Sequence, residues 1–319
     1  MQKNNNNRNV FTQKPFVVLF ATLTALIWAF AFPLIKLGFN SFDIANDDIG
    51  SKTLFAGIRF FSAGLLTLFI GKITKKKFSI KGKRSILLLI LFALVNTSFH
   101  YFFFYIGISN LPGSRSAIID SLSTFFLIIL ACIVFKNERM TTKKAVGCLL
   151  GFTGILLINL EFGSSDNISF SFVGDGMLLM SAICSAFGGV LTRIVTKKID
   201  AIVATGISLA LGGLVLTIVG IIMGGSFYVI NVHGIIILIL LILVSAIGFS
   251  LYNKLISCNP VGEIAIFNSL IPVFGAILSC IILKEAFYTK YILASLFGVL
   301  GVYIINKNGS ISNDVGIDN

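Results

Sequence analysis

The sequence predicts an all-α integral membrane protein with ten transmembrane helices, arranged as two inverted five-helix repeats with both termini in the cytoplasm. Three observations support this fold class: the composition, a series of apolar stretches of membrane-spanning length, and an internal repeat. Of the 319 residues, 56% are hydrophobic and only 12% are charged, and the mean hydropathy is +0.97. A soluble core of this size could not hide so much apolar surface, so we expect lipid to be the solvent of this chain.

The internal repeat relates the two halves of the chain. Residues 138–159 recur as residues 285–306, and without a gap Glu138 faces Glu285 and Gly151 faces Gly298. Because each half contains an odd number of predicted spans, the second copy must lie upside down relative to the first. Inverted repeats of this kind are common among secondary transporters.

Each predicted span is an apolar stretch long enough to cross a bilayer about 30 Å thick at about 1.5 Å per residue. In chain order the ten stretches are 17–36, 54–71, 85–108, 114–135, 142–160, 174–195, 201–223, 233–256, 261–283 and 288–306. The third and fourth are separated by the turn at Pro112 and Gly113, and the eighth and ninth by Asn259 and Pro260. Both turns are typical helix stops.

The spans divide the chain into five segments. A disordered cytoplasmic tail at 1–16 is followed by a first five-helix repeat at 17–160, an external linker at 161–173, a second five-helix repeat at 174–306 and a cytoplasmic tail at 307–319. The first span is too long for a signal-peptide core, and no small-residue cleavage site follows it, so we expect it to be retained.

The positive charge of the chain indicates its orientation and not a nucleic-acid partner. The net charge is +12, but the Lys and Arg residues cluster in short loops between spans, most densely at 72–84. An N-terminus in the cytoplasm places most of the basic residues on the cytoplasmic side, as the positive-inside rule requires. Glu138 is then cytoplasmic and Glu285 external, and both are expected to set loop geometry at equivalent helix ends.

No cofactor, metal site or enzymatic activity is predicted. The five cysteines lie in or beside apolar stretches without CxxC spacing, and the two histidines, His100 and His233, are far apart in the chain. There is no Walker motif and no clustered pair of acidic residues near the membrane surface, which disfavours a membrane enzyme or an ATPase.

Small residues recur at four-residue or shorter intervals in the fifth and tenth spans. Such stripes let helix backbones approach closely, so these spans are expected to pack on each other or across a homodimer. The alternative is that they fill a crowded bundle. The residues are Gly147, Gly151 and Gly154 in the fifth span and Ala294, Gly298 and Gly301 in the tenth.

Several short motifs, together with the duplicated half, are similar to those of a known family. They are Ala25-Leu26-Ile27-Trp28 with Lys36, Ile58-Arg59-Phe60, Tyr105, Glu138-Arg139, Asp175, the stretch 181–193, Ile271-Pro272-Val273-Phe274 and Lys284-Glu285. On these residues the chain resembles the EamA-type transporters of the drug/metabolite transporter superfamily. The resemblance implies ten helices around a central cavity and efflux or exchange of amino acids, related metabolites or drugs by alternating access.

Two departures from the family pattern matter. Ala29 stands where the family usually has Gly, and Ser123-Thr124-Phe125 stands where it often has a proline in the fourth span. The ninth span keeps Pro272, so the two halves are expected to hinge unequally. Pro33 and Pro272 are expected to interrupt the first and ninth spans, either as static kinks or as bends used in rocking.

Three ionisable residues lie inside predicted spans, where a charge is costly and therefore points to function. Arg59, His100 and Asp120 share a layer of the outer half of the membrane. We hypothesise that they line a polar cavity in which Asp120 pairs with Arg59 or takes a proton or a substrate amine, with His100 tuning it. In the alternative, Arg59 snorkels to the headgroups, Asp120 bonds to helix neighbours and His100 is a satisfied interior histidine.

Aromatic and amide side chains form a second layer of candidates. Trp28, Asn96, Tyr101, Tyr252 and Asn268 lie within spans, and Trp28 is too deep for an interfacial belt. Aromatic walls with a few hydrogen-bonding groups suit small zwitterions or amphiphiles, although residues at helical spacing also serve in packing. With Arg59, His100 and Asp120 they make up the predicted substrate-binding set.

The predicted function is therefore secondary transport of a small metabolite, an amino acid or related compound, exported across the plasma membrane, which the resemblance indicates is a bacterial inner membrane. A multidrug or amphiphilic-cation efflux transporter is one alternative, and a polytopic membrane protein without transport is another. The expected partners are a small-molecule substrate, the lipid bilayer and, in one packing alternative, a second copy of the chain.

Overall fold

The computed structural model describes residues 9–159 and 170–284, together with isolated helical positions between 293 and 304. Within that part of the chain all regular structure is helical, and eight helical segments are long and apolar enough to cross a membrane. They are Lys14–Ser41, Ile49–Ile73, Lys83–Ser109, Arg115–Val134, Phe172–Thr196, Ala201–Ile222, Val232–Cys258 and Val261–Leu283. The chain is thus an all-helical membrane protein, as predicted.

The count of ten spans stays a prediction. Helix α8 (Thr142–Asn159) occupies the predicted fifth span, but it is not among the eight segments above. The predicted tenth span, Glu285 and the C-terminal tail lie largely or wholly outside the described residues, as does most of the predicted linker.

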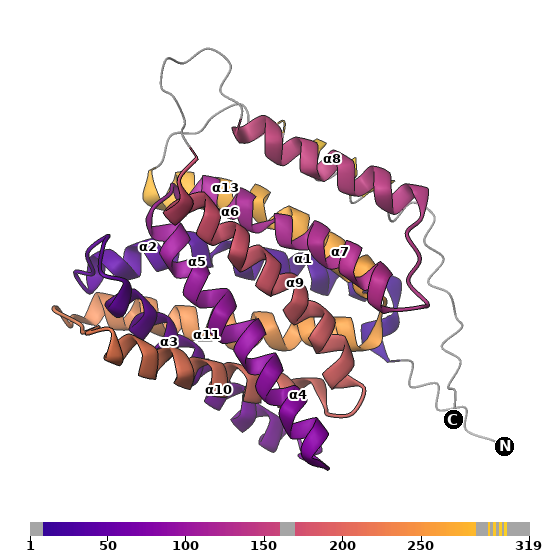
Figure 1. Ribbon diagram of the computed structural model, residues 1–319, viewed down its shortest axis with the longest axis horizontal. Helices are drawn as coiled ribbons and strands as arrows, with labels where there is room; N and C mark the ends of the chain where they lie inside the picture. The colour runs from indigo at the N-terminus through magenta and orange to yellow at the C-terminus, as the bar shows by residue number, and fades with distance from the viewer. Residues whose placement is uncertain are drawn as a thin grey trace.

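Several spans consist of two or three helical pieces in succession, and Figure 1 labels the longer α-helical pieces. The pieces other than α8 are η1 (Val10–Thr12), α1 (Lys14–Ala29), α2 (Ala31–Ser41), α3 (Ile49–Ile73), α4 (Lys83–Ala93), η2 (Leu94–Phe99), α5 (His100–Ser109), α6 (Gly113–Asp120), α7 (Leu122–Val134), η3 (Phe172–Gly176), α9 (Met177–Thr196), α10 (Ala201–Ile222), α11 (Val232–Cys258), α12 (Val261–Ala265), η4 (Ile266–Leu270) and α13 (Ile271–Leu283).

The N-terminal tail differs from the prediction at its inner end. Residues 10–12 form a 3-10 turn, and α1 begins at Lys14 within the segment predicted to be disordered. The Asn9 side chain accepts a hydrogen bond from the Phe11 N–H, and the Phe11 ring packs on Phe20 with centroids 5.4 Å apart. These local contacts order the chain before the apolar stretch starts.

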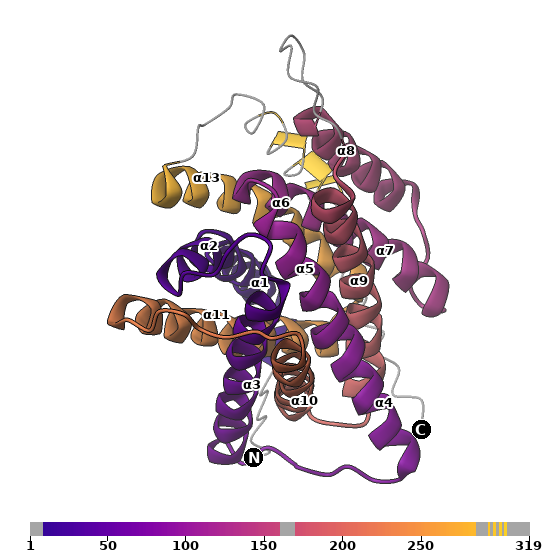
Figure 2. The ribbon, with the colours of Figure 1, turned by 60° about the vertical axis from the view of Figure 1, so that its left-hand side comes forward.

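Among the described helices, α3 and α10 form the most closely packed pair, and they lie side by side at one edge, with α8 at the opposite edge (Figures 1 and 2). Glycines allow this approach: a Cβ on Gly64 would lie 2.2 Å from the Ala210 N, and one on Gly213 would lie 2.2 Å from the Phe61 N. Backbone meets backbone along the whole crossing, as small residues permit in membrane helices. The pair presents Arg59, on α3, to the centre of the bundle.

One of the predicted small-residue contacts is visible. A Cβ on Gly301 would lie 2.8 Å from the carbonyl oxygen of Gly147 in α8. The predicted fifth span and this described position of the tenth therefore touch within one chain. This contact favours the prediction that the two spans pack on each other.

Four of the spans that the structure describes are interrupted. The first breaks at Phe30 between α1 and α2, the third contains the π-helical segment η2, the fourth breaks at Ser121 between α6 and α7, and the ninth contains the 3-10 segment η4. Pro33 explains the first break, because a proline is accommodated in the first turn of α2 but not within a continuous helix. Pro272 likewise stands at the start of α13.

That the two halves hinge unequally stays a prediction, but the fourth span breaks although it lacks a proline, so this span and the equivalent ninth span are both interrupted. The Ser121 hydroxyl donates to the Ile118 carbonyl at 2.6 Å, and the Ser269 hydroxyl donates to the Ile266 carbonyl at 2.7 Å in the ninth span. A serine that bonds the backbone in this way competes with the helical hydrogen bonds. A serine-to-carbonyl hydrogen bond is thus present at the helix interruption in both the fourth and the ninth span.

Candidate functional site

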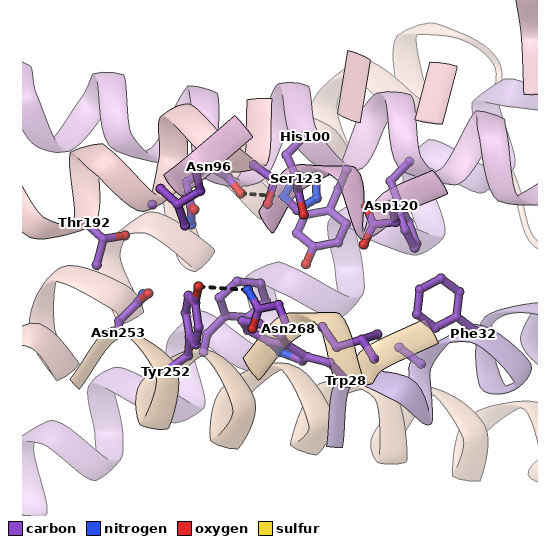
Figure 3. A pocket seen from close by; sticks show the side chains of 18 of the residues that line it. Trp28, Phe32, Asn96, His100, Asp120, Ser123, Thr192, Tyr252, Asn253 and Asn268 are labelled. Carbon is purple, nitrogen blue, oxygen red and sulfur yellow. Dashed lines mark hydrogen bonds between the residues drawn. The ribbon is translucent and has the colours of Figure 1, made fainter. Parts of the chain in front are cut away.

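The interrupted spans, together with α3, α9 and α11, line a cavity that holds about 810 Å³ of space between atoms, a volume that includes the open solvent at its mouth. Figure 3 shows Asn96, Thr192 and Asn253 at one end of the cavity, Asp120 and Phe32 at the other, and Tyr252, Asn268 and Trp28 between them. All eight residues of the predicted binding set line this one cavity. They are Trp28, Arg59, Asn96, His100, Tyr101, Asp120, Tyr252 and Asn268.

Trp28 forms an aromatic wall of the cavity with residues of α11. Its ring centroid lies 5.1 Å from that of Phe249 and 4.8 Å from that of Tyr252. Gly248 provides the space, because a Cβ there would lie 2.6 Å from the indole Nε1. The Nε1 is buried against α11 and has no acceptor in the part of the chain that the structure describes.

Arg59 is buried and does not snorkel. It is only 2% exposed, its Nη1 donates to the Tyr105 hydroxyl at 2.8 Å, and its Nε donates to the Ser245 hydroxyl at 2.8 Å and to the Leu241 carbonyl at 3.2 Å. Its guanidinium also lies 4.7 Å from the centroid of the Phe60 ring. These contacts fix a positive charge in the cavity wall.

Asp120 stands at the end of α6, where the fourth span breaks. Its Oδ1 is buried, and no donor for it exists among the described residues. Because Arg59 is held by Tyr105 and Ser245 and forms no ion pair with Asp120 in this part of the chain, the predicted pairing of the two is not observed. A buried carboxyl oxygen without a partner is costly in lipid surroundings, which makes it the group most in need of a ligand.

His100 and Asn96 form part of the opposite wall. The His100 Nδ1 lies 3.3 Å from the Asn96 carbonyl oxygen, and the imidazole stacks on Tyr101 with centroids 4.2 Å apart. Tyr101 in turn stacks on Phe60 at 3.9 Å. Asn96 lies in η2, and π-helical segments are frequent at functional sites. An effect of His100 on Asp120 stays a prediction.

A hydrogen bond between Asn268 and Tyr252 joins two spans. The Asn268 Nδ2 donates to the Tyr252 hydroxyl at 2.8 Å (Figure 3). Asn268 lies in the 3-10 segment η4, so its backbone conformation differs from that of a continuous helix. Its amide oxygen is an acceptor available to a ligand.

Sequence reasoning missed part of the lining and one relation within it. The missed lining residues include Ser123, Ser185 and Thr192. Asn253, which the sequence does indicate as a polar candidate in the eighth span, also lines the cavity and donates to the Thr205 hydroxyl at 2.9 Å. The missed relation is a second stretch of the internal repeat.

Residues 112–136 align with residues 260–284 without a gap. In this alignment Pro112 faces Pro260, Ser121 faces Ser269 and Asp120 faces Asn268. Asp120 and Asn268 are therefore equivalent positions of the two repeats, both at a helix break and both in the cavity. The alignment was available in the sequence as a signal that these two residues belong together.

The comparisons with known proteins agree with this architecture. The profile of the EamA-like transporter family matches residues 15–160 and again residues 172–307. An uncharacterized transporter of Bacillus subtilis, YvbV, is 27% identical over 95% of this chain and 96% of its own length. A second transporter of the same organism, YetK, also uncharacterized, is 24% identical over 80% of this chain and 78% of its own length.

Two further matches add detail. A WAT1-related protein of Arabidopsis thaliana, named chloroplastic, is 28% identical over 79% of this chain, and the match spans 62% of that longer protein. A crystal structure superposes with a TM-score of 0.70 over 90% of this chain and 96% of the other. At 14% identity this second likeness shows the fold alone.

Proposed function

Because the chain belongs to the EamA-like transporter family, and is thus a membrane transporter and not an enzyme, we propose that it exports a small metabolite that carries an amine, namely an amino acid or a related compound. Alternating access of the cavity to the two sides of the membrane would carry the substrate across. The membrane would be the plasma membrane, a bacterial inner one, with both termini in the cytoplasm.

The observation that carries the proposal is the unpaired Oδ1 of Asp120 in an aromatic cavity. An ammonium group supplies the donors that this carboxyl group lacks, and aromatic faces such as that of Trp28 attract the same charge. Few other groups in the lining could compensate a cation within the membrane. The cavity is therefore suited to an amine.

An amino acid fits better than a simple amine because Arg59 lines the same cavity. Its guanidinium offers N–H groups beyond those donated to Tyr105 and Ser245, and a carboxylate matches such a fork. A zwitterion placed between Asp120 and Arg59 would leave neither charge uncompensated.

The second candidate is efflux of amphiphilic cations. It is favoured by the aromatic wall of Trp28, Phe249 and Tyr252, which could hold a flat cation without any contact to Arg59. The two candidates differ in whether the substrate needs a carboxylate.

The test is flux into and out of liposomes that contain the purified protein, with a panel of labelled amino acids and amphiphilic cations, with and without a pH gradient. We expect flux of amino acids, and we expect Asp120→Asn to abolish it. The matched control is Asp43→Asn, which removes an exposed carboxylate outside the cavity at a left-handed backbone position (φ 53°) that asparagine tolerates.

The outcomes separate the candidates. Flux of cations alone would replace the amino-acid proposal with the efflux one. Flux that Asp120→Asn leaves unchanged would show that this carboxyl group does not bind the substrate. A dependence on the pH gradient that disappears in Asp120→Asn would identify proton coupling, whereas flux that ignores the gradient would identify a facilitator.

A further inference from the structure

We propose that Glu138 is a latch, a releasable contact between the two halves of the transporter. Its carboxylate holds the N-terminus of α12, which closes the cavity on the side of the membrane where Glu138 lies and positions Asn268 inside the cavity. This inference rests on the proposed function, because it names a step of alternating access at the same cavity. Glu138 itself does not line the cavity and acts through α12.

The latch consists of two hydrogen bonds from one half to the other. Glu138 lies between α7 and α8, is 3% exposed, and accepts the Val261 N–H at 2.6 Å and the Gly262 N–H at 3.0 Å. The Lys144 Nζ lies 3.8 Å from the same carboxylate. Hydrogen bonds to an ionised acceptor are about twice as strong as neutral ones.

Helix α12 depends on this contact. It has only five residues, and its N-cap residue, Pro260, provides no side-chain hydrogen bond. The first N–H groups of a helix need partners, and in the described part of the chain Glu138 supplies two of them from outside the helix. The absence of a side chain at Gly262 admits the carboxylate, because a Cβ there would lie 3.3 Å from its Oε2.

Helix α12 connects the latch to the cavity. It continues directly into η4, so Asn268 follows Gly262 by less than two helical turns. Helix α12 also packs against α7, and α6 packs against α13, so the broken spans of the two halves are mutual neighbours. Movement of α12 relative to α7 would therefore displace Asn268 from the Tyr252 hydroxyl to which it donates.

Release of this contact has a cost that holds this end of the cavity closed. When the two halves separate at this end, the carboxylate and both N–H groups would be left without partners, and only water could replace them. In this proposal, opening of this end to water requires the release of Glu138. Each hydrogen bond to a charged group biases a two-state equilibrium by roughly tenfold or more.

The test measures which side of the membrane reaches the cavity, and it needs no substrate. Ser123, which lines the cavity, is replaced by cysteine in a chain whose native cysteines have been replaced. A membrane-impermeant thiol reagent is applied from each side of oriented vesicles, and the labelling rate is compared between the parent and its variants. Size-exclusion chromatography confirms that each variant is folded.

We expect Glu138→Ala to raise the labelling rate roughly tenfold from the side on which Glu138 lies, the cytoplasmic side in the predicted topology, and to lower it from the other side. Glu138→Gln removes the charge and one acceptor, and should give a smaller shift in the same direction. If Glu138→Ala does not fold, the glutamine variant carries the test.

The matched control is Glu263→Gln, which neutralises a half-buried carboxyl group at the same helix end that accepts neither N–H. Its labelling rates should stay within twofold of the parent's. Equal acceleration from both sides in the Glu138 variants, or no change at all, would overturn the proposal. Absence of amino-acid flux would overturn the proposed substrate without touching the labelling result, so the two failures are distinguishable.

Discussion

Replacing Gly64 by alanine should separate α3 from α10 and destabilise the protein. The added Cβ would lie 2.2 Å from the Ala210 N, and ordinary contact begins at 3.4 Å, so the helices would have to move apart by about 1.2 Å (3.4 − 2.2 = 1.2). The obstructing atoms are backbone and have no rotamer to escape into. Overpacking of this kind costs about 1–3 kcal/mol, less up to about 1 kcal/mol that alanine gains over glycine in a helix.

The assay is thermal unfolding of purified protein in detergent. With an unfolding entropy of about 2.1 cal/mol/K per residue, about 2 kcal/mol corresponds to a fall in Tm of about 3 °C for the 319 residues of this chain. Gly71→Ala is the matched control on the same helix, because its Cβ would lie 3.5 Å from the Phe78 ring, an ordinary contact. It should leave the Tm unchanged or raise it. A Gly64 variant as stable as the Gly71 variant would refute the close backbone crossing.

Three further predictions concern polar contacts. Tyr252→Phe removes the acceptor of Asn268 and should raise the half-saturating substrate concentration in flux assays about two- to tenfold, whereas an unchanged value would exclude a role for this bond. Arg59→Lys should lower stability by about 1–2 kcal/mol in thermal unfolding, because an ammonium cannot reach both side-chain acceptors of the guanidinium fork. A double-mutant cycle on Arg115 and Asp175, 2.7 Å apart and largely buried, should give a coupling energy of about 1 kcal/mol, and a value near zero would contradict the ion pair.

The described spans could be predicted closely because their signal is simple: a bilayer of fixed thickness requires an apolar stretch of fixed length. The breaks within them were harder to predict. Pro33 and Pro272 mark two of them, but Ser121 breaks the fourth span through a hydroxyl that bonds to the Ile118 carbonyl. Serine is common in membrane helices and interrupts few of them, so the presence of Ser121 did not predict a helix break.

The candidate site was predictable for side chains that are costly in lipid. Arg59 and Asp120 attract attention because a charge within a span needs a reason, and both line the cavity. The partners of Arg59 were not predictable, since they depend on how α3, α5 and α11 cross. Thr192 was overlooked because a threonine hydroxyl normally bonds within its own helix, as this one does to the Gly188 carbonyl at 2.9 Å.

Asp120 can carry a charge and Asn268 cannot, and this difference has an electrical consequence. The two positions are equivalent in the repeats, but only the first half carries an ionisable group there. A zwitterion brings no net charge to the site, but in the efflux alternative a cationic ligand would make the net charge of the loaded cavity differ by one unit from that of the empty cavity, and this charge crosses part of the transmembrane field. Half of the field at 100 mV corresponds to about 1 kcal/mol, enough to change the rate of a step that carries this charge severalfold. The membrane potential would then act unequally on the loaded and unloaded steps of a cation carrier, whereas it would act equally on both steps of an amino-acid carrier.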